Sequence, residues 1–225
     1  MTIRSHLWFV LVLIGLSLPA VAADSKDDRP LVVLLGDSIR MNYQQSVREA
    51  LAGKAEVWSP KENCRHTFFT LENLEGWLKS RSPDLIHINV ELRDIFLNAK
   101  TDKPRHTLTA YEKNLRAMFN KLDGPTEAKV IFAIATAVDE KLQAASKSYR
   151  RVVRRNKHVR SYNAVARRVA KESKVTVNDL NAFMVNAGPE KIFRPTDGIQ
   201  LSPSGCKLIG NKVARVIASK LSIQP

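Results

Sequence analysis

The sequence predicts an α/β protein with one parallel sheet that is covered by helices on both faces. After residue 30, short apolar runs alternate with amphipathic segments along the chain, which is the pattern of strand–helix units. The apolar runs are continuous, which is typical of strands buried on both faces. The sequence shows no internal repeat, low-complexity tract or linker. We therefore expect three layers, α/β/α, in a single domain.

The expected strands are short, and a helical pattern follows each of them. Strands are predicted at residues 31–35, 56–58, 85–90, 130–135 and 175–177. Helices are predicted where apolar residues recur at helical spacing, at residues 39–51, 71–78, 111–122, 159–169 and 208–221. Thr109 and Glu112 form a capping box, and Ser202 with Pro203 begins the last helix. Residues 141–157 are expected as a long loop or an irregular helix.

The N-terminus has the pattern of a secretory signal peptide. A short polar stretch at residues 4–6 precedes an apolar run at residues 7–18, and Ala20-Val21-Ala22 offers a cleavage site. The apolar run is too short to span a membrane. We expect a signal peptide at residues 1–22, a mature domain at residues 23–225 and a secreted or periplasmic protein without a transmembrane segment. An uncleaved anchor helix is the alternative.

The chain is strongly basic, with a formal net charge of +14. Residues 141–174 contain twelve Lys and Arg residues and one acid, Glu172. Such a field attracts polyanions, and an exported protein is not expected to meet nucleic acid. An anionic glycan or cell-envelope polymer is one expected partner of this segment. The alternative is a solvated face without a partner.

The first chemical motif follows the first predicted strand. Gly36-Asp37-Ser38 lies where that strand ends, and sites in such sheets form beyond the carboxyl ends of the strands. Ser38 would begin the next helix, whose free amides stabilise an anion. The alternative is an N-capping serine without a chemical role.

A second motif near the C-terminus makes the first one more specific. With residues 196–205, which include Asp197-Gly198-Ile199-Gln200, the chain resembles the SGNH/GDSL hydrolase family from about residue 31 to residue 221. The resemblance implies a flavodoxin-like parallel sheet (the SGNH hydrolase fold) and hydrolysis of carboxylic esters, often acyl groups on lipids or carbohydrates. It implies that Ser38 is the nucleophile and Asp197 the residue that orients the base, while Gln200 stands at the family's histidine position.

Two further family blocks also depart from the pattern. The second block corresponds to Asn63-Cys64-Arg65-His66-Thr67, which lacks the glycine whose amide enters the oxyanion hole. In the third block Glu91 replaces the glycine and Arg93 the asparagine, and Asp94 follows. Arginine can donate hydrogen bonds to an oxyanion. Alternatively, Glu91, Arg93 and Asp94 form a local ion-pair cluster.

The missing base decides what chemistry is expected. A serine needs a general base to become a useful nucleophile near neutral pH, and an amide is not one. His66 lies in the second block, so a relocated base at His66 is a hypothesis, whereas His87 is expected in the core. No metal-ligand spacing is present, and neither a metal nor another cofactor is expected.

Two functions therefore remain open. The first is an exported ester hydrolase of weak activity that acts on a small-molecule or polysaccharide ester. The second is a catalytically inactive homologue that binds acylated or acidic glycans or another anionic surface. The resemblance also brings Cys64 and Cys206 to the same end of the sheet, where a disulfide is one alternative and two free thiols the other.

Overall fold

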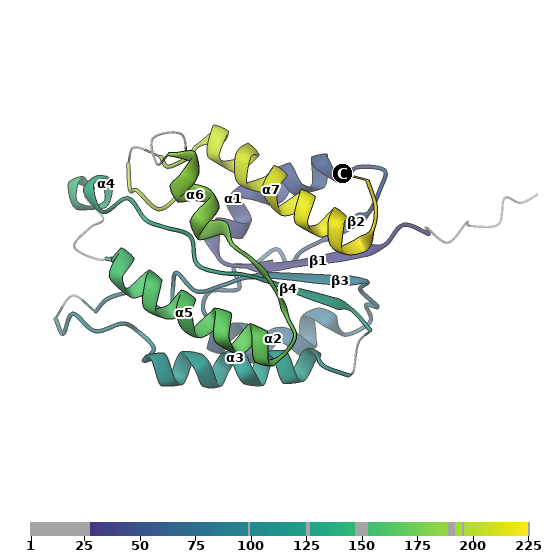
Figure 1. Ribbon diagram of the computed structural model, residues 1–225, viewed down its shortest axis with the longest axis horizontal. Coiled ribbons are helices and arrows are strands. Elements are labelled where there is room, and N and C mark those ends of the chain that lie inside the picture. The colour runs from purple at the N-terminus through teal and green to yellow at the C-terminus, as the bar shows by residue number, and fades with distance from the viewer. Residues whose placement is uncertain are drawn as a thin grey trace, which may run out of the picture.

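The computed structural model describes residues 28–98, 100–124, 127–146, 153–188, 192–194 and 196–224. Its centre is a five-stranded, wholly parallel sheet with the strand order β2-β1-β3-β4-β5 (Figure 1). The strands are β1 (Leu31–Gly36), β2 (Glu56–Trp58), β3 (Leu85–Asn89), β4 (Lys129–Ala133) and β5 (Thr176–Asn178). This order is the flavodoxin-like one, and it reverses direction between β1 and β3.

Helices cover both faces of the sheet, as Figure 1 shows. One face carries α1 (Ser38–Ala50), α6 (Leu180–Ala187) and α7 (Pro203–Leu221), and α1 packs against α7. The other face carries α2 (Thr67–Leu78), α3 (Leu108–Leu122) and α5 (Asn156–Glu172), with α3 packed between the other two. The short helix α4 (Glu140–Ala145) lies beyond the carboxyl end of β4.

The core is formed where apolar strands meet apolar helix faces. Val32, Val33, Leu34 and Leu35 of β1 are completely buried, because strands lie on both sides of β1 and helices above and below it. Burial of such side chains is the main favourable contribution to folding. The register pairs Gly36 at the end of β1 with Asn89 at the end of β3, so the loops after these two strands begin side by side.

The expected three-layer α/β/α fold is confirmed. The capping prediction was wrong: Thr107, and not Thr109, accepts the Ala110 amide and begins α3. Helix α6 was missed. Residues 141–157 include the last part of α4 and the first residues of α5, and residues 147–152 between them lie outside the described residues.

The expected signal peptide also lies outside the described residues, so the division into residues 1–22 and 23–225 stays a prediction. Across the described ranges, the structure contains no helix that is both long and apolar enough for a membrane span. Cys64 and Cys206 are free thiols. Of the two alternatives, the structure therefore has two free thiols and no disulfide between Cys64 and Cys206.

Candidate functional site

The turn after β1 places a serine hydroxyl at the start of a helix. Asp37 caps α1 by accepting the Ile39 amide at 2.9 Å, so Asp37 rather than Ser38 is the N-capping residue. Ser38 is the first residue of α1, and the amide of a first helical residue has no partner within the helix. A side chain is not tolerated at Gly36, because a Cβ there would lie 2.4 Å from the Arg40 Cβ and 2.7 Å from the Asn89 carbonyl oxygen.

The turn before α7 brings Gln200 to this serine. The side-chain amide of Gln200 donates a hydrogen bond from Nε2 to Ser38 Oγ at 3.2 Å. Asp197 fixes the turn, since its Oδ1 accepts the amides of Ile199 at 2.8 Å and Gln200 at 2.7 Å. Gly198 has φ +63°, and a Cβ there would lie 2.3 Å from the Asp139 carbonyl oxygen. Gln200 therefore stands beside Ser38 where a base would be needed, while the Asp197 carboxylate binds the backbone of the turn.

A cavity of about 340 Å³ opens beside these residues. It is lined by Ser38, Arg93, Phe96, Arg154, Asp197 and Gln200, and Ile199 completes the wall. The cavity lies beyond the carboxyl ends of β1 and β3, where the strand order reverses, which is the usual ligand position in an open α/β sheet. Segments far apart in the sequence thus form one cleft, which we call the Ser38 cleft.

The charged groups at the cleft are strongly influenced by burial. Burial raises the pKa of Asp37 to about 6, and the Ile39 amide and the charges of Arg154 and Arg93 partly oppose that rise. Burial also lowers the pKa of Arg154 to about 10, so its guanidinium stays protonated at neutral pH. Among the described residues that line it, the cleft therefore holds two cationic side chains, Arg93 and Arg154, and no imidazole that could accept a proton from Ser38.

The second-block segment forms its turn without a glycine. Arg65 takes the left-handed conformation with φ 58°, which is uncommon for a residue with a side chain. The Cys64 amide donates to the Gly36 carbonyl oxygen at 3.0 Å, and the Arg65 amide donates to Asn63 Oδ1 at 2.7 Å. Both amides are therefore committed elsewhere and are not available to an oxyanion. Neither Cys64, Arg65 nor His66 lines the Ser38 cleft.

A buried arginine fastens this segment to the turn after β1. Arg40 is completely buried and donates to the carbonyl oxygens of Gly36 at 3.2 Å, Pro60 at 3.2 Å and Glu62 at 2.8 Å. Its remaining contacts include Gln44 Oε1 at 2.6 Å. Since charge-assisted hydrogen bonds are the stronger ones, Arg40 fixes the relative position of the two loops.

Glu91, Arg93 and Asp94 do not form the ion-pair cluster that was one alternative. Glu91 is buried and accepts the Ala135 amide at 3.0 Å, and burial raises its pKa well above the usual range. Asp94 points away from the Ser38 cleft and accepts Thr67 Oγ1 and His106 Nδ1, both at 2.6 Å. Of these three side chains, only Arg93 reaches the cleft.

His66 is placed as a helix cap. Its Nδ1 accepts the Phe69 amide at 3.3 Å, and its ring lies edge-on to His106 with centroids 4.8 Å apart. Burial lowers the pKa of His66 to about 4, so the ring is neutral near pH 7. A neutral imidazole that accepts at Nδ1 carries its proton on Nε2. His66 therefore has no free basic nitrogen for Ser38, and the structure favours no relocated base there. As expected, His87 is buried in β3.

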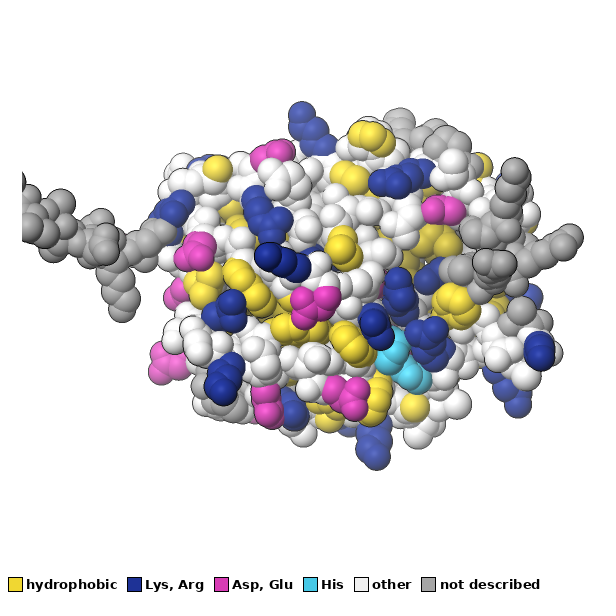
Figure 2. All heavy atoms as spheres, turned by 180° about the vertical axis from the view of Figure 1, so that it is seen from behind, with side chains coloured by type: hydrophobic (Ala, Val, Ile, Leu, Met, Phe, Trp, Pro, Cys, Tyr) yellow, Lys and Arg dark blue, Asp and Glu magenta, His cyan; other side chains and the backbone are white. Residues whose placement is uncertain are grey.

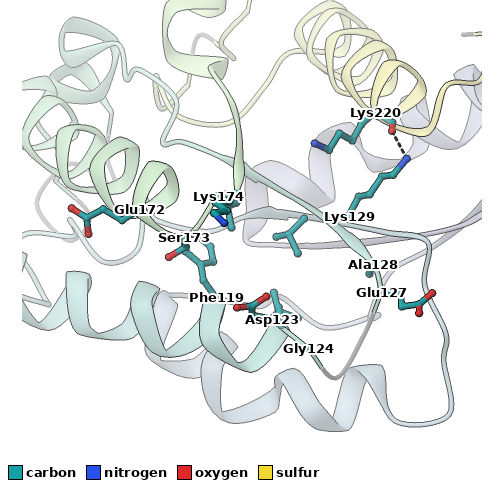
Figure 3. Close-up of a pocket in the computed structure, with 13 residues that line it drawn as sticks. Phe119, Asp123, Gly124, Glu127, Ala128, Lys129, Glu172, Ser173, Lys174 and Lys220 are labelled. Carbon is teal, nitrogen blue, oxygen red and sulfur yellow. Dashed lines mark hydrogen bonds between the residues drawn. The ribbon is translucent and has the colours of Figure 1, made fainter.

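A second hollow lies at the other end of the sheet (Figure 3). It measures about 440 Å³ and is bounded by the start of β4 and the last turns of α3 and α5. Lys129, Lys174, Glu172 and Asp123 are among its lining residues, and Lys129 Nζ donates to the Lys220 carbonyl oxygen at 3.0 Å. Its charges are mixed, and the expected site residues are all elsewhere.

Three arginines in and just before α5 are paired with carboxylates. Arg155 pairs with Asp102 at 2.9 Å, Arg167 with Asp179 at 2.5 Å and Arg168 with Glu112 at 2.6 Å. Figure 2 shows other Lys and Arg side chains gathered around histidine on the face seen from behind. The expectation of an anionic partner for residues 141–174 thus stays a prediction, and residues 147–152 of that segment lie outside the described residues.

Sequence reasoning missed two residues of the cleft, Phe96 and Arg154. Phe96 follows the third block without a motif of its own. Arg154 is one cation among twelve in its segment, and nothing in the sequence distinguishes it from its neighbours. Within the described ranges, no three His, Cys, Asp or Glu side chains gather in a way that could hold a metal ion.

The comparisons with known proteins agree on one kind of fold. No family model matches. The GDSL esterase/lipase CPRD49 of Arabidopsis thaliana is 24% identical over 209 residues, which are 84% of this chain and 79% of that protein. A lipase/acylhydrolase from Enterococcus faecalis has a TM-score of 0.69 at 21% identity, covering 85% of this chain and 96% of its own. The acetyl xylan esterase AlAXEase has a TM-score of 0.66 at 18% identity, covering 83% and 99%.

Proposed function

The sequence match to a GDSL esterase/lipase and the shared fold support the SGNH/GDSL hydrolase family for this chain, and from that premise we propose that it is an exported ester-binding protein with slow hydrolytic activity. Its ligands are carboxylic esters, with acylated carbohydrate as the favoured class. The observation that carries the proposal is the hydrogen bond from Gln200 Nε2 to Ser38 Oγ. This hydrogen bond joins Ser38 to the position at which the family has its histidine. The Gln200 amide donates to the serine hydroxyl, however, whereas a base would accept its proton.

The chemistry follows from the groups that meet in the cleft. Ser38 Oγ would attack the ester carbonyl carbon and pass its proton to solvent water; the alcohol would then leave with a proton from water, and a second water would hydrolyse the acyl-serine. The donors that the cleft offers to the developing oxyanion are the Ser38 amide, at the start of α1, and the guanidinium groups of Arg93 and Arg154. Gln200 cannot take the serine proton. Removal of the base from a serine triad costs up to ~10⁶ in turnover, while ~10³–10⁴ over water can persist.

The favoured ligand class is argued from the cleft and from the structural neighbours. An acetyl xylan esterase is among the proteins with this fold, and its substrate is an acylated carbohydrate by its name. Phe96 and Ile199 give the cleft two apolar walls, which suit a short acyl group. The cavity of about 340 Å³ is at the small end of the usual range for ligand pockets.

Hydrolysis of p-nitrophenyl acetate tests the catalytic part of the proposal. The wild type should release nitrophenol slowly but above the buffer rate, and Ser38→Ala should lower the rate to that of buffer. A fluorophosphonate probe should label the wild type at Ser38 and leave Ser38→Ala unlabelled. Equal rates in the two proteins, together with no labelling, would show that the serine does no chemistry.

A second candidate, an inactive homologue that only binds, is favoured by a specific observation. The amides of Cys64 and Arg65 are both committed away from the cleft, and Gln200 replaces the base. This candidate predicts saturable binding of an acetylated xylo-oligosaccharide without any Ser38-dependent turnover. Turnover that depends on Ser38 excludes it.

Export is part of the same proposal, and it rests on the N-terminal sequence pattern. Expression of the full chain in a bacterial host with separate periplasmic and cytoplasmic fractions tests it. The exported product should begin at residue 23, as determined by N-terminal sequencing. A cytoplasmic protein that keeps residues 1–22 would contradict it.

A further inference from the structure

A buried cation lies in the Ser38 cleft without an anionic partner among the described residues. Arg154 is 6% exposed and lines the cavity beside Ser38. Its Nε donates to the Leu92 carbonyl oxygen. Within the described part of the chain, its two terminal NH2 groups donate to no acceptor, and no carboxylate lies within ion-pair distance of it.

A second and a third arginine extend this positive region. Arg93 lines the same cavity, is half-buried and has no ion-pair partner in the described ranges. Two guanidinium groups lie near the Phe96 ring: that of Arg105 is 5.1 Å from the ring centroid and that of Arg154 is 5.5 Å from it. The aromatic ring stabilises these cations without using their N–H groups, so the terminal NH2 groups of Arg154 can still donate to a ligand.

Among the described residues, the carboxylates nearest to the cleft form no ion pair with the two lining arginines, although the charges of Asp37 and Asp197 act on Arg154 from a greater distance. Asp197 uses Oδ1 for the amides of Ile199 and Gln200. Asp37 is buried and accepts the Ile39 amide, and its pKa is raised to about 6. A buried charge without a partner is costly to a folded protein. A low-dielectric cleft lined by one sign of charge also concentrates ligands of the opposite sign.

We propose that the Ser38 cleft binds carbohydrate esters that also carry an anionic oxygen group, a carboxylate or a sulfate, held between Arg154 and Arg93. This inference rests on the proposed function, because it specifies the ligand of the same cleft. Guanidinium groups match the planar, bidentate geometry of such anions. By contrast, Arg155 just before α5 and Arg167 and Arg168 within it already have carboxylate partners. Arg154 and Arg93, which line the cleft beside Ser38, are therefore the candidates for selective binding.

Three ligands that differ in one substituent test the proposal. They are acetylated galactotriose, the same acetylated galactotriose carrying one sulfate, and the acetylated trisaccharide in which a single galactose is replaced by galacturonate. Affinities are measured by isothermal titration calorimetry at low and at physiological salt. At least one anionic ligand should bind tenfold or more tightly than the neutral ligand, and salt should weaken only the anionic binding. Which anionic ligand binds more tightly distinguishes the carboxylate from the sulfate.

Variants show whether the preference comes from the cleft. Arg154→Gln should weaken binding of the preferred anionic ligand about 30-fold or more, because it removes one partner of a buried charge pair. Arg93→Gln should weaken it less, since Arg93 is half-buried. Arg215→Gln removes the same charge from an exposed position on α7 and should leave all three affinities unchanged. If circular dichroism shows that Arg154→Gln does not fold, the affinities of Arg93→Gln for the three ligands are compared with those of the wild type instead.

The outcomes separate this inference from the proposed function. Equal binding of the neutral and anionic ligands, unchanged in Arg154→Gln and Arg93→Gln, overturns the inference and leaves an ester-binding cleft standing. Absence of binding by all three ligands, with no turnover that depends on Ser38, overturns both. An equal loss in Arg215→Gln would show that net charge, and not the cleft, determines the preference.

Discussion

Gln200 Nε2 donates a hydrogen bond to Ser38 Oγ at 3.2 Å, so the serine hydroxyl is an acceptor toward the residue that should be its base. The two side chains are in register because Asp197 fixes the backbone of the turn that carries Gln200. Gln200 therefore lies within hydrogen-bond distance of Ser38, but its side chain is an amide and cannot act as a base. The substitution Gln200→His tests whether a base at this position activates Ser38.

We expect Gln200→His to raise hydrolysis of p-nitrophenyl acetate by about a hundredfold or more, because a positioned base contributes ~10²–10⁴ to the rate. Steady-state kinetics measure the gain. Its control is the double variant Ser38→Ala with Gln200→His, which should lose all of it. Absence of any gain would mean that Arg93 and the committed amides of Cys64 and Arg65 fail to support the oxyanion, so that the base is not the limiting group.

Asp197 is expected to act on the backbone of its own turn. Asp197→Asn keeps an acceptor oxygen for the amides of Ile199 and Gln200 and should change the free energy of unfolding by less than ~0.5 kcal/mol. Asp197→Ala leaves both amides without that acceptor and should cost about 1–2 kcal/mol. Urea denaturation followed by circular dichroism measures the two values. Equal stability of the two variants would rule out the backbone role.

The buried carboxyl of Asp37 predicts a pH dependence of stability. Its pKa rises from an ordinary 3.8 to about 6 in the folded protein. The folded state therefore holds the proton more tightly, and this contribution to stability is lost as the pH rises from about 4 to 6. Asp37→Asn does not titrate, yet it can still cap α1. Between pH 4 and pH 7, the free energy of unfolding of the variant should therefore rise by up to about 3 kcal/mol relative to that of the wild type.

Urea denaturation of both proteins at pH 4, 5, 6 and 7 measures that difference. His66 and His87 also titrate with shifted pKa values, but they are present in both proteins and cancel in the comparison. Glu91 does not cancel fully, because the charge of Asp37 helps to raise its pKa. A stability difference that is constant across this range would show that Asp37 is not the group responsible.

Arg40 is predicted to be essential for joining two loops at the cleft. Arg40→Met should lower the free energy of unfolding by at least ~3 kcal/mol, because it leaves the carbonyl oxygens of Gly36, Pro60 and Glu62 without their donor. Arg215→Met, at an exposed position, is the matched control and should have little effect. A similar loss in both variants would point to net charge instead of the hydrogen bonds.

The two cysteines give a direct check of the fold near the cleft. Without reductant, the denatured protein should react with two equivalents of a thiol reagent, one for Cys64 and one for Cys206. In the folded protein only Cys206 should react quickly, since Cys64 is completely buried and burial raises its pKa. A denatured protein with no reactive thiol would contain the disulfide that the structure does not.

Sequence reasoning predicted the sheet well because its evidence is local. Leu31–Gly36 is an unbroken apolar run, and Gly36-Asp37-Ser38 follows it directly, so the strand, the turn and the helix start are written in consecutive residues. Thr109 was chosen as a cap from a plausible spacing, yet Thr107 takes that role. Thr107 and Thr109 are both suitable capping residues by their local sequence, and the packing of the helix determines which of them is the N-cap.

The side chains of the cleft were less predictable because their positions depend on the whole fold. Glu91, Arg93 and Asp94 are neighbours in sequence, but they point to three different environments. Arg154 reaches the cleft from a segment more than fifty residues later. The sequence shows that His66 belongs to the second-block segment. Only the structure shows that its Nδ1 accepts the Phe69 amide and is therefore not available to Ser38.

Gly36 and Gly198 have consequences for how protein sequences are assigned to enzymes. Each glycine is required by a close backbone approach, and that requirement holds whether or not Ser38 ever attacks an ester. The glycines of the motifs Gly-Asp-Ser and Asp-Gly-Ile are thus required by the fold as much as by a reaction. A search for these motifs will therefore group proteins that only share the fold with active enzymes. The residue three positions after the aspartate, which is Gln200 in this chain, distinguishes the two kinds of protein.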